Sequence, residues 1–262
     1  MANNKNRNGG NRRGAAIYTP VAALLVLFIV IFGVSVFFRV TKIEVTRTTK
    51  AGNASSGRYT DDEIIAASGV EAGDNIFLLN GDAAARRITA AMPYISDVRV
   101  GMKIPDTAVL EVTESVPFAA IQNGTDYWKV DSAGRILERT DYSGSAGLIR
   151  VTGLTLSSPK EGAKIAVDST YETQLGYTLD VMAAIDGADI SGKVSSLDVT
   201  NISSITFTYN NTVVVRFGGG DNAEFKITKV LNALEEYKKT YMVEFKGTVD
   251  VSKDDKTNVI PG

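Results

Sequence analysis

The first strong pattern in the chain is an uncharged, mostly apolar run over residues 14–38, which ends directly before Arg39. Its 25 residues would form a helix roughly 37 Å long, and the hydrocarbon core of a bilayer needs only about 30 Å. A cleaved signal peptide has a shorter apolar region that ends in small residues, whereas this run ends in two phenylalanines. The pattern therefore predicts an uncleaved transmembrane helix over residues 15–38.

The charges on either side of this run predict its orientation. Lys5, Arg7, Arg12 and Arg13 precede it, and no acidic residue stands among them. Because short basic tails are retained in the cytoplasm, residues 1–14 are expected inside the cell and the rest of the chain outside it. The expected topology is single-pass type II in the cell (cytoplasmic) membrane.

Beyond the membrane segment, the pattern first predicts a strand and then a helix. Apolar side chains mark the strand over residues 40–45. Thr60 and Glu63 can form a capping box, in which each side chain accepts a hydrogen bond from a backbone N–H of the other residue. The helix that begins there should end at Gly69, because glycine readily adopts the left-handed conformation of a C-terminal cap.

A second helix and two strands follow in the pattern. An alanine-rich helix should begin near residues 80–82 and end before Pro93, since proline disfavours helix in the residue before it. Alternating apolar positions then predict strands over residues 98–104 and 109–116. The predicted order of this module is strand, helix, helix, strand, strand.

From Phe118 onward, the pattern predicts mostly strands, with two further helices. A hairpin is expected over residues 126–137. Ser169 and Glu172 form a second candidate capping box, and a final helix should begin at Asp221 or the next residue. The other expected strands cover residues 194–199, 205–209, 213–217 and 247–252.

Composition excludes several classes of enzyme. The chain has no cysteine and no histidine, so thiol nucleophiles, histidine bases, disulfides and the usual zinc sites are absent. When the four basic residues of the tail are left out, the chain has 24 Lys and Arg and 30 Asp and Glu. This excess of acidic residues argues against a nucleic-acid partner. We predict no enzyme activity, no cofactor, no metal and no small-molecule substrate.

Two features near the final helix invite a functional interpretation. Residues 218–220 are three glycines, but the lysine and hydroxyl residue that complete a phosphate-binding loop do not follow them. A turn that lets Asp221 cap the helix is the better interpretation. Lys226 could be a catalytic lysine, but no nucleophile motif accompanies it.

Two further features also have structural explanations. Glu111 and Glu114 could form a pair of carboxylates, but a spacing of three residues places them on opposite faces of a strand. Both are expected to face solvent. Trp128 could hold a ligand, but a single tryptophan in a hairpin is more often half-buried packing.

Several blocks of the sequence resemble the FtsQ/DivIB family of bacterial cell-division proteins. The first blocks are F-R-V-T-K-I-E-V from Phe38 and S-G-V-E-A-G-D-N-I-F-L-L-N from Ser68. The most diagnostic block is P-Y-I-S-D-V-R-V-G-M-K-I-P-D-T-A-V-L-E-V-T-E-S-V-P-F-A from Pro93. D-Y-W-K-V-D-S-A-G-R-I-L from Asp126 resembles the start of the family's β-rich domain. The family commonly has a lysine in the first turn of its final helix, where this chain has Lys226, and the resemblance implies a buried pair between that lysine and a neighbouring carboxylate.

This resemblance implies the fold class of the chain. We expect a single N-terminal transmembrane helix followed by an α+β ectodomain, in which a POTRA (β-α-α-β-β) module precedes a mixed β-sheet domain with flanking helices. The expected segments are a basic tail over 1–14, the helix over 15–38, the POTRA domain over 39–117 and the β domain over 118–262.

The resemblance also implies a function, namely a non-enzymatic divisome scaffold at the division septum. Such a protein binds bitopic coiled-coil proteins of the FtsB/DivIC and FtsL types outside the cytoplasm and helps control septal peptidoglycan synthesis. A membrane-anchored extracytoplasmic enzyme and a POTRA-type chaperone of envelope assembly are the alternatives. The enzyme lacks a nucleophile motif, and the chaperone would require barrel strands that the pattern lacks.

In this family, the end of the β domain binds the FtsB/DivIC-type partner. The strand from Thr248 to Ser252 is the last one expected, so we predict that it lies at a sheet edge, where a partner strand can be added. One of the amides of Thr248 and Val249 should then face outward. The predicted partner-binding residues are Tyr241, Phe245, Lys246, Thr248, Val249, Asp250, Val251, Ser252, Val259 and Ile260.

Overall fold

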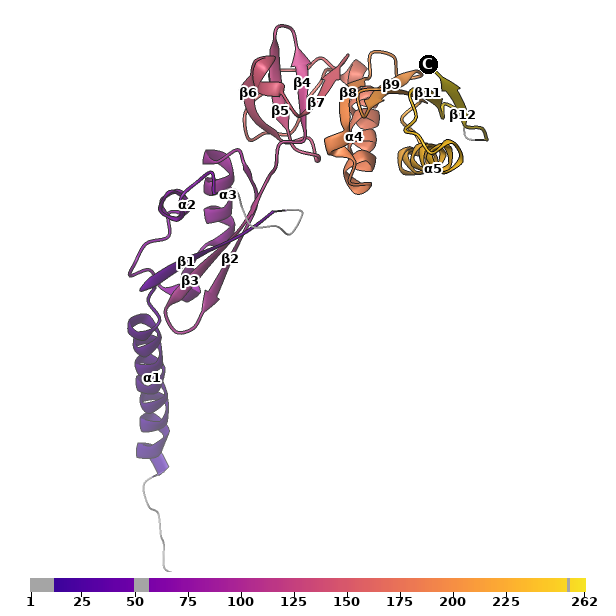
Figure 1. Cartoon of the computed structure of the whole chain (residues 1–262). Coiled ribbons are helices and arrows are strands. Elements are labelled where there is room, and N and C mark those ends of the chain that lie inside the picture. Colours follow the sequence, from indigo (N-terminus) through magenta and orange to yellow (C-terminus); the bar gives the residue numbers. More distant parts are fainter. Residues whose placement is uncertain (1–11, 50–56, 254) are drawn as a thin grey trace, which may run out of the picture. The chain divides into compact units, whose positions relative to one another are not determined.

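A computed structural model of the chain describes residues 12–49, 57–253 and 255–262 (Figure 1). Most of the basic tail therefore lies outside the described residues, and so do residues 50–56, which stand between the first predicted strand and the first predicted helix of the module. The described chain forms two compact units. The first contains residues up to Thr46 with Tyr59–Ala85 and Arg99–Glu111, and the second contains the described parts of Arg47–Arg58 with Arg86–Val98 and Val112–Gly262.

Helix α1, Arg12–Phe37, covers the segment predicted to cross the membrane. Every residue from Leu24 to Phe32 is exposed, and the exposed fractions reach 65% at Leu24 and 68% at Phe28. Nine consecutive residues make more than two turns of helix, so apolar side chains are exposed on all sides of this part of α1. When only the described residues are considered, none of the helices has both the length and the hydropathy needed to cross a membrane.

The predicted strand, helix, helix, strand, strand order is confirmed. A three-stranded sheet forms with β3 between the other two strands (Figure 1). The elements are β1 (Lys42–Thr49), α2 (Asp61–Ser68), η1 (Ile76–Leu78), α3 (Gly81–Ala91), β2 (Ile95–Lys103) and β3 (Thr107–Glu114).

The predicted start and end of α2 are also confirmed. The backbone amide of Glu63 donates to the Thr60 hydroxyl at 3.2 Å, and the Thr60 amide donates to the Glu63 carboxylate at 2.7 Å. The amide and the hydroxyl of Thr60 both donate to the Glu63 carboxylate, and these two bonds hold the pKa of Glu63 below its ordinary value. Gly69 ends the helix with a φ of 65°, in the left-handed region that glycine adopts without steric cost.

The second sheet has nine strands in the order β12-β11-β10-β9-β8-β7-β4-β5-β6. It is a mixed sheet, because β4–β7, β7–β8 and β10–β11 are parallel pairs and the other pairs are antiparallel. Its strands are β4 (Ala119–Asn123), β5 (Asp126–Val130), β6 (Ile136–Thr140), β7 (Ile149–Thr152), β8 (Val194–Asp198), β9 (Ile205–Tyr209), β10 (Val213–Gly218), β11 (Gly247–Asp250) and β12 (Asn258–Pro261).

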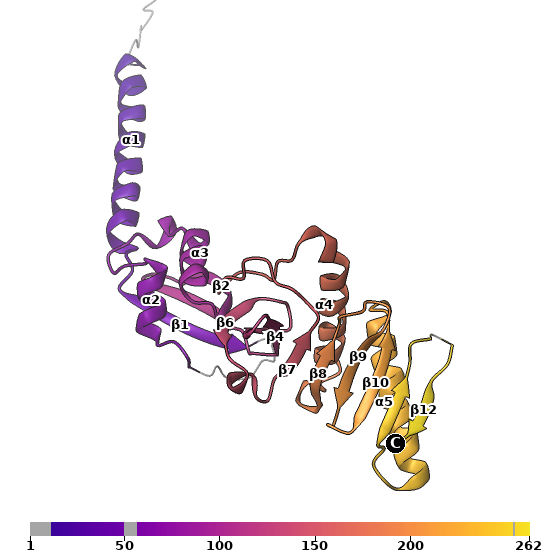
Figure 2. The same ribbon diagram turned by 90° about the horizontal axis from the view of Figure 1, so that it is seen from above.

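Helices α4 (Glu172–Gly187) and α5 (Ala223–Tyr241) lie along this sheet (Figure 2). Side chains of both helices join the strand side chains in one hydrophobic core. The strands alternate accordingly: Phe207 and Val215 are buried, and Val214 is 44% exposed. The predicted mixed sheet with flanking helices is confirmed.

Two predicted helix starts are wrong in detail. Ser169 does not cap α4, because Ser169–Tyr171 forms the separate 3-10 turn η3 and α4 begins only at Glu172, without a side-chain cap. Asp221 does not cap α5 either. The residue that precedes α5 is Asn222, which has a φ of 56° and makes no side-chain capping bond.

The predicted domain boundary at residues 117–118 lies between the two sheets, since the first ends at Glu114 and the second begins at Ala119. The compact units are divided differently. Arg135, in the second unit, donates to the backbone carbonyls of Thr89 and Pro93 at 2.8 Å each. The end of α3 therefore packs with the larger sheet, and independent folding of residues 39–117 stays a prediction.

Candidate functional site

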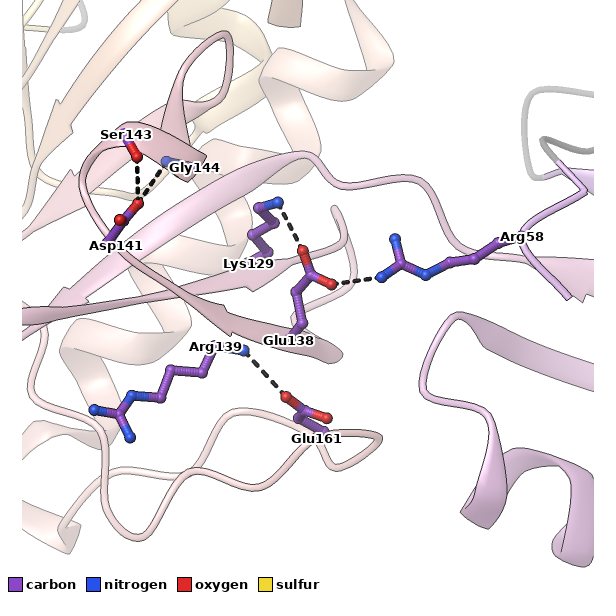
Figure 3. A network of polar contacts seen from close by, with 8 residues as sticks. All are labelled: Arg58, Lys129, Glu138, Arg139, Asp141, Ser143, Gly144 and Glu161. Atoms are coloured by element: carbon purple, nitrogen blue, oxygen red, sulfur yellow. Dashed lines mark hydrogen bonds and ion pairs between the residues drawn. The ribbon is translucent and has the colours of Figure 1, made fainter.

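One end of the large sheet, at β6, is covered by the chain itself. The amide of Ile136 donates to the carbonyl of Ala163, and the amide of Gly162 donates to the carbonyl of Ile136, each at 2.8 Å. The amide of Arg139 donates to the Glu161 carboxylate at 3.2 Å (Figure 3). These bonds use outward-facing groups of β6, so this end is a poor site for adding a strand.

An ion-pair network also holds β5 and β6 at this end (Figure 3). The Glu138 carboxylate lies 2.7 Å from the Lys129 ammonium and 2.6 Å from the Arg58 guanidinium. Burial by itself would raise the pKa of Glu138, but Lys129, Tyr94 and Arg58 together hold it below its ordinary value. The network is a structural feature of the hairpin.

The prediction that the strand from Thr248 lies at the sheet edge is wrong. Strand β11 lies between β10, which is parallel to it, and β12, which is antiparallel. The Gly247 amide donates to the carbonyl of Thr212, directly before β10, at 3.2 Å, and the Val251 amide donates to the carbonyl of Arg216 in β10 at 2.9 Å. The Val249 amide between them therefore also faces β10. The Thr248 amide must then face β12. Both amides lie within the sheet because the chain beyond Ser252 turns back and adds one more strand.

The strand at this end of the sheet is β12. Within the described residues, no strand pairs with its outer side. The amide of Gly262 donates to the carbonyl of Lys246 at 3.2 Å, and Ile260 is paired with Thr248. Because backbone groups alternate along a strand, the N–H and C=O of Ile260 face β11, and those of Val259 face outward.

Two residues shape this edge. Pro261 has the same orientation as Val259 but no N–H, so the outer side of β12 offers an amide donor at Val259 and carbonyl acceptors at both positions. Gly247 is paired with Pro261 and has a φ of 135°. A Cβ on Gly247 would lie 2.3 Å from the carbonyl oxygen of Ile260, so only glycine lets β12 approach this closely.

The structure divides the predicted partner-binding residues into two groups. Phe245, Val249 and Val251 are buried, with exposed fractions of 4% or less, and they belong to the core of the domain. They cannot contact a partner without opening the fold. The predicted residues that are exposed or half-buried are Tyr241, Lys246, Thr248, Asp250, Ser252, Val259 and Ile260.

An exposed apolar patch lies at the end of α5, where the predicted residue Tyr241 is joined by Met242 and Val243, which were not predicted. The exposed fractions of the three residues are 61%, 84% and 54%. The ring of Tyr237 holds Tyr241 against the domain, since its centroid lies 4.5 Å from that of Tyr241 and 4.9 Å from that of Phe245. The sequence could have indicated this patch, because three apolar residues follow the last charged turn of an amphipathic helix.

A tight turn ends β11. The backbone amide and the hydroxyl of Ser252 donate to one carboxylate oxygen of Asp250, at 3.0 and 2.7 Å. These bonds, with the nearby charges of Arg216 and Lys253, hold the pKa of Asp250 below its ordinary value, although burial opposes the shift. The turn helps to start the chain reversal that leads into β12.

The lowered pKa of Asp250 predicts a pH dependence of stability. A carboxylate whose folded pKa is lowered stabilises the fold above its unfolded pKa of about 4, and this contribution is lost as pH falls through the folded value. Asp250→Asn should therefore lower the free energy of unfolding by at most about 1 kcal/mol near pH 6, and the gap from the wild type should be smaller at about pH 3. Denaturant unfolding at both pH values measures it. A gap of equal size at both would contradict the prediction.

Lys226 pairs with a carboxylate as expected, but only the lysine is buried, because the side chain of Asp221 is 59% exposed. The lysine is 1% exposed, and its ammonium lies 3.7 Å from the Asp221 carboxylate. The ammonium also has a closer partner that was not predicted. It donates to the carbonyl of Gly219 at 2.9 Å. The ring of Phe217 lies 5.3 Å away. The three glycines therefore form a turn that presents a carbonyl to a buried lysine.

The remaining candidates are explained by packing. Glu111 and Glu114 lie on opposite faces of β3, as predicted, but Glu114 does not face solvent. It is 3% exposed, and Arg47 lies 3.9 Å from its carboxylate. Trp128 is half-buried and packs against the core of the second unit, as predicted.

Comparison with known proteins adds independent evidence. Residues 54–115 match the family model of the FtsQ-type POTRA domain, and residues 119–252 match that of the C-terminal domain of cell division protein FtsQ/DivIB. Cell division protein DivIB of Clostridium acetobutylicum is 30% identical, over 73% of each chain. DivIB of Clostridium botulinum strain Loch Maree is 26% identical over 88% of each chain, and FtsQ of Syntrophotalea carbinolica is 27% identical over 71% of this chain and 61% of its own.

Proposed function

This chain belongs to the FtsQ/DivIB family of bacterial cell-division proteins, and on that premise we propose that it is a non-enzymatic, bitopic scaffold of the divisome. It binds FtsB/DivIC-type and FtsL-type division proteins outside the cytoplasm. Through these complexes it helps control septal peptidoglycan synthesis.

The observation that carries this proposal is the open edge at β12. A partner segment in extended conformation would accept a hydrogen bond from the Val259 amide and would donate hydrogen bonds to the carbonyls of Val259 and Pro261. The apolar patch of Tyr241, Met242 and Val243, together with the half-exposed side chain of Ile260, offers further contact area. Binding of an FtsB/DivIC-type segment to proline variants of β12 tests the proposal, and a proline that blocks the outer side of β12 should weaken that binding.

The membrane anchor is part of the same proposal. It consists of residues 15–38, with residues 1–14 in the cytoplasm and the remainder outside. Two observations support it: the run of 25 uncharged residues over 14–38, and the exposure of apolar side chains on all sides of α1 between Leu24 and Phe32. Exposure of this kind suits a lipid environment better than water.

Topology is directly testable with fusion proteins. A reporter that is active only outside the cytoplasm should be active after Gly262 and inactive at the N-terminus, because the basic residues of the tail hold that end inside. A second reporter, active only in the cytoplasm, should give the opposite pattern. Activity of the first reporter at the N-terminus, with none after Gly262, would reverse the proposed orientation.

A further inference from the structure

Four large apolar side chains are exposed on two loops of the first unit. Phe77 and Leu78 lie in η1, and their exposed fractions are 46% and 81%. Met102 lies near the end of β2 and Ile104 in the turn that follows it, with exposed fractions of 48% and 63%. Single exposed apolar residues are common on soluble domains, but two loops that both carry a pair of them call for an explanation.

Both loops are bound to the short segment that directly follows α1. On the η1 side, the amide of Ile76 donates to the carbonyl of Phe38 at 3.0 Å, and the Phe38 and Phe77 ring centroids lie 5.1 Å apart. On the other side, the amide of Thr41 donates to the carbonyl of Asp106 at 2.8 Å. These bonds place both loops beside the C-terminal end of α1, inside one compact unit (Figure 1).

We propose that Phe77, Leu78, Met102 and Ile104 form a lipid-facing rim, which inserts into the interfacial region of the outer leaflet around the emerging helix. The inference rests on the proposed anchor, because a helix that crosses the membrane leaves the hydrocarbon core near Phe37. Side chains beside that point lie at the depth of the headgroups, where apolar groups gain from leaving water.

The charged residues near the rim fit the same location. Lys42 and Lys103 have side-chain exposures of 65% and 66%, and both ammonium groups lie 2.6 Å from the Glu44 carboxylate. Asp106, in the same turn as Ile104, also attracts Lys42, so Glu44 and Asp106 together balance the charges of the two lysines. The long apolar stems of the lysines can lie along the rim while the ammonium groups reach lipid phosphates. A protein ligand on the rim is the alternative occupant, and the test distinguishes it.

Site-directed spin labelling of the full chain in lipid nanodiscs tests the rim. The chain contains no cysteine, so a nitroxide attaches only where one is introduced. The Leu78→Cys and Ile104→Cys variants should be several-fold less accessible to an aqueous nickel relaxant than the Ala66→Cys variant, and more accessible to oxygen. Ala66 is the matched control because it is exposed on α2 in the same unit.

A label at Phe28→Cys separates this inference from the anchor on which it rests. If that label shows bilayer-core accessibility while Leu78→Cys and Ile104→Cys match Ala66→Cys, the rim is wrong and the anchor stands. If Phe28→Cys is itself open to the aqueous relaxant, both are wrong. Protection of the rim labels only after a partner protein is added would assign the rim to a protein ligand and overturn the lipid proposal.

Discussion

Replacing Val259 with proline should weaken binding of the FtsB/DivIC-type partner by more than about tenfold while leaving the melting temperature nearly unchanged. The substitution removes the outward amide of β12 and places a ring where an incoming strand would pair. The lost hydrogen bond is worth only about 1 kcal/mol net, and the steric obstruction adds the rest. Pro261, two positions on, shows that β12 accepts proline in this orientation.

Ile260→Pro is the matched control, because the amide of Ile260 faces β11 opposite Thr248. It should lower the melting temperature by breaking the ladder that holds β12. Val259→Ala separates loss of the side chain from loss of the amide, and should bind nearly as the wild type does. Calorimetry with the partner's extracytoplasmic segment, and thermal melts of the same preparations, give the two readouts. Wild-type affinity in a well-folded Val259→Pro protein would remove β12 as the docking edge.

Replacing Lys226 with alanine should lower the free energy of unfolding of the second unit by about 2 to 4 kcal/mol. Two losses combine. The carbonyl of Gly219 loses the ammonium donor at 2.9 Å, and a fully buried four-carbon stem leaves a cavity beside Phe217. Lys226→Met keeps most of the volume and loses only the polar contacts, so its effect should be smaller.

Trp128 is the single tryptophan of the chain and packs against the core of the second unit, so its fluorescence reports unfolding of that unit. Lys239→Ala serves as the control on the same helix. That lysine is 74% exposed and pairs with Glu235, and its loss should change stability by no more than about 0.5 kcal/mol. Equal stabilities for Lys226→Ala and Lys239→Ala would mean that the contacts of the buried Lys226 side chain do not contribute to the free energy of unfolding.

Local signals in the sequence predicted most of the elements correctly. The capping box of Thr60 and Glu63 and the cap at Gly69 work over three or four residues, so the same bonds form wherever that segment lies in the fold. Ser169 and Glu172 have the same spacing, and there the prediction failed. A 3-10 turn over Ser169–Tyr171 occupies the position instead, because a short motif does not decide between two local hydrogen-bond patterns.

The candidate site was predicted only in part. The sequence alone led to the family, to the order of the two domains and to the end of the chain as the binding region. It did not reveal β12, because four residues that end in proline carry little strand signal of their own. It also could not distinguish the buried Val249 from the half-exposed Val259, since both read as apolar positions in short strands.

Only the tertiary structure decided which strand is at the edge and which amide faces outward. Caps and periodicity depend on neighbours in sequence, and the chain therefore encodes them locally. The order of a sheet depends instead on pairing between distant residues, such as Gly262 with Lys246 and Ile260 with Thr248. A shift of that pairing by one residue would exchange inward and outward groups along the whole strand, so the groups that the proposed docking edge presents are a property of the folded sheet.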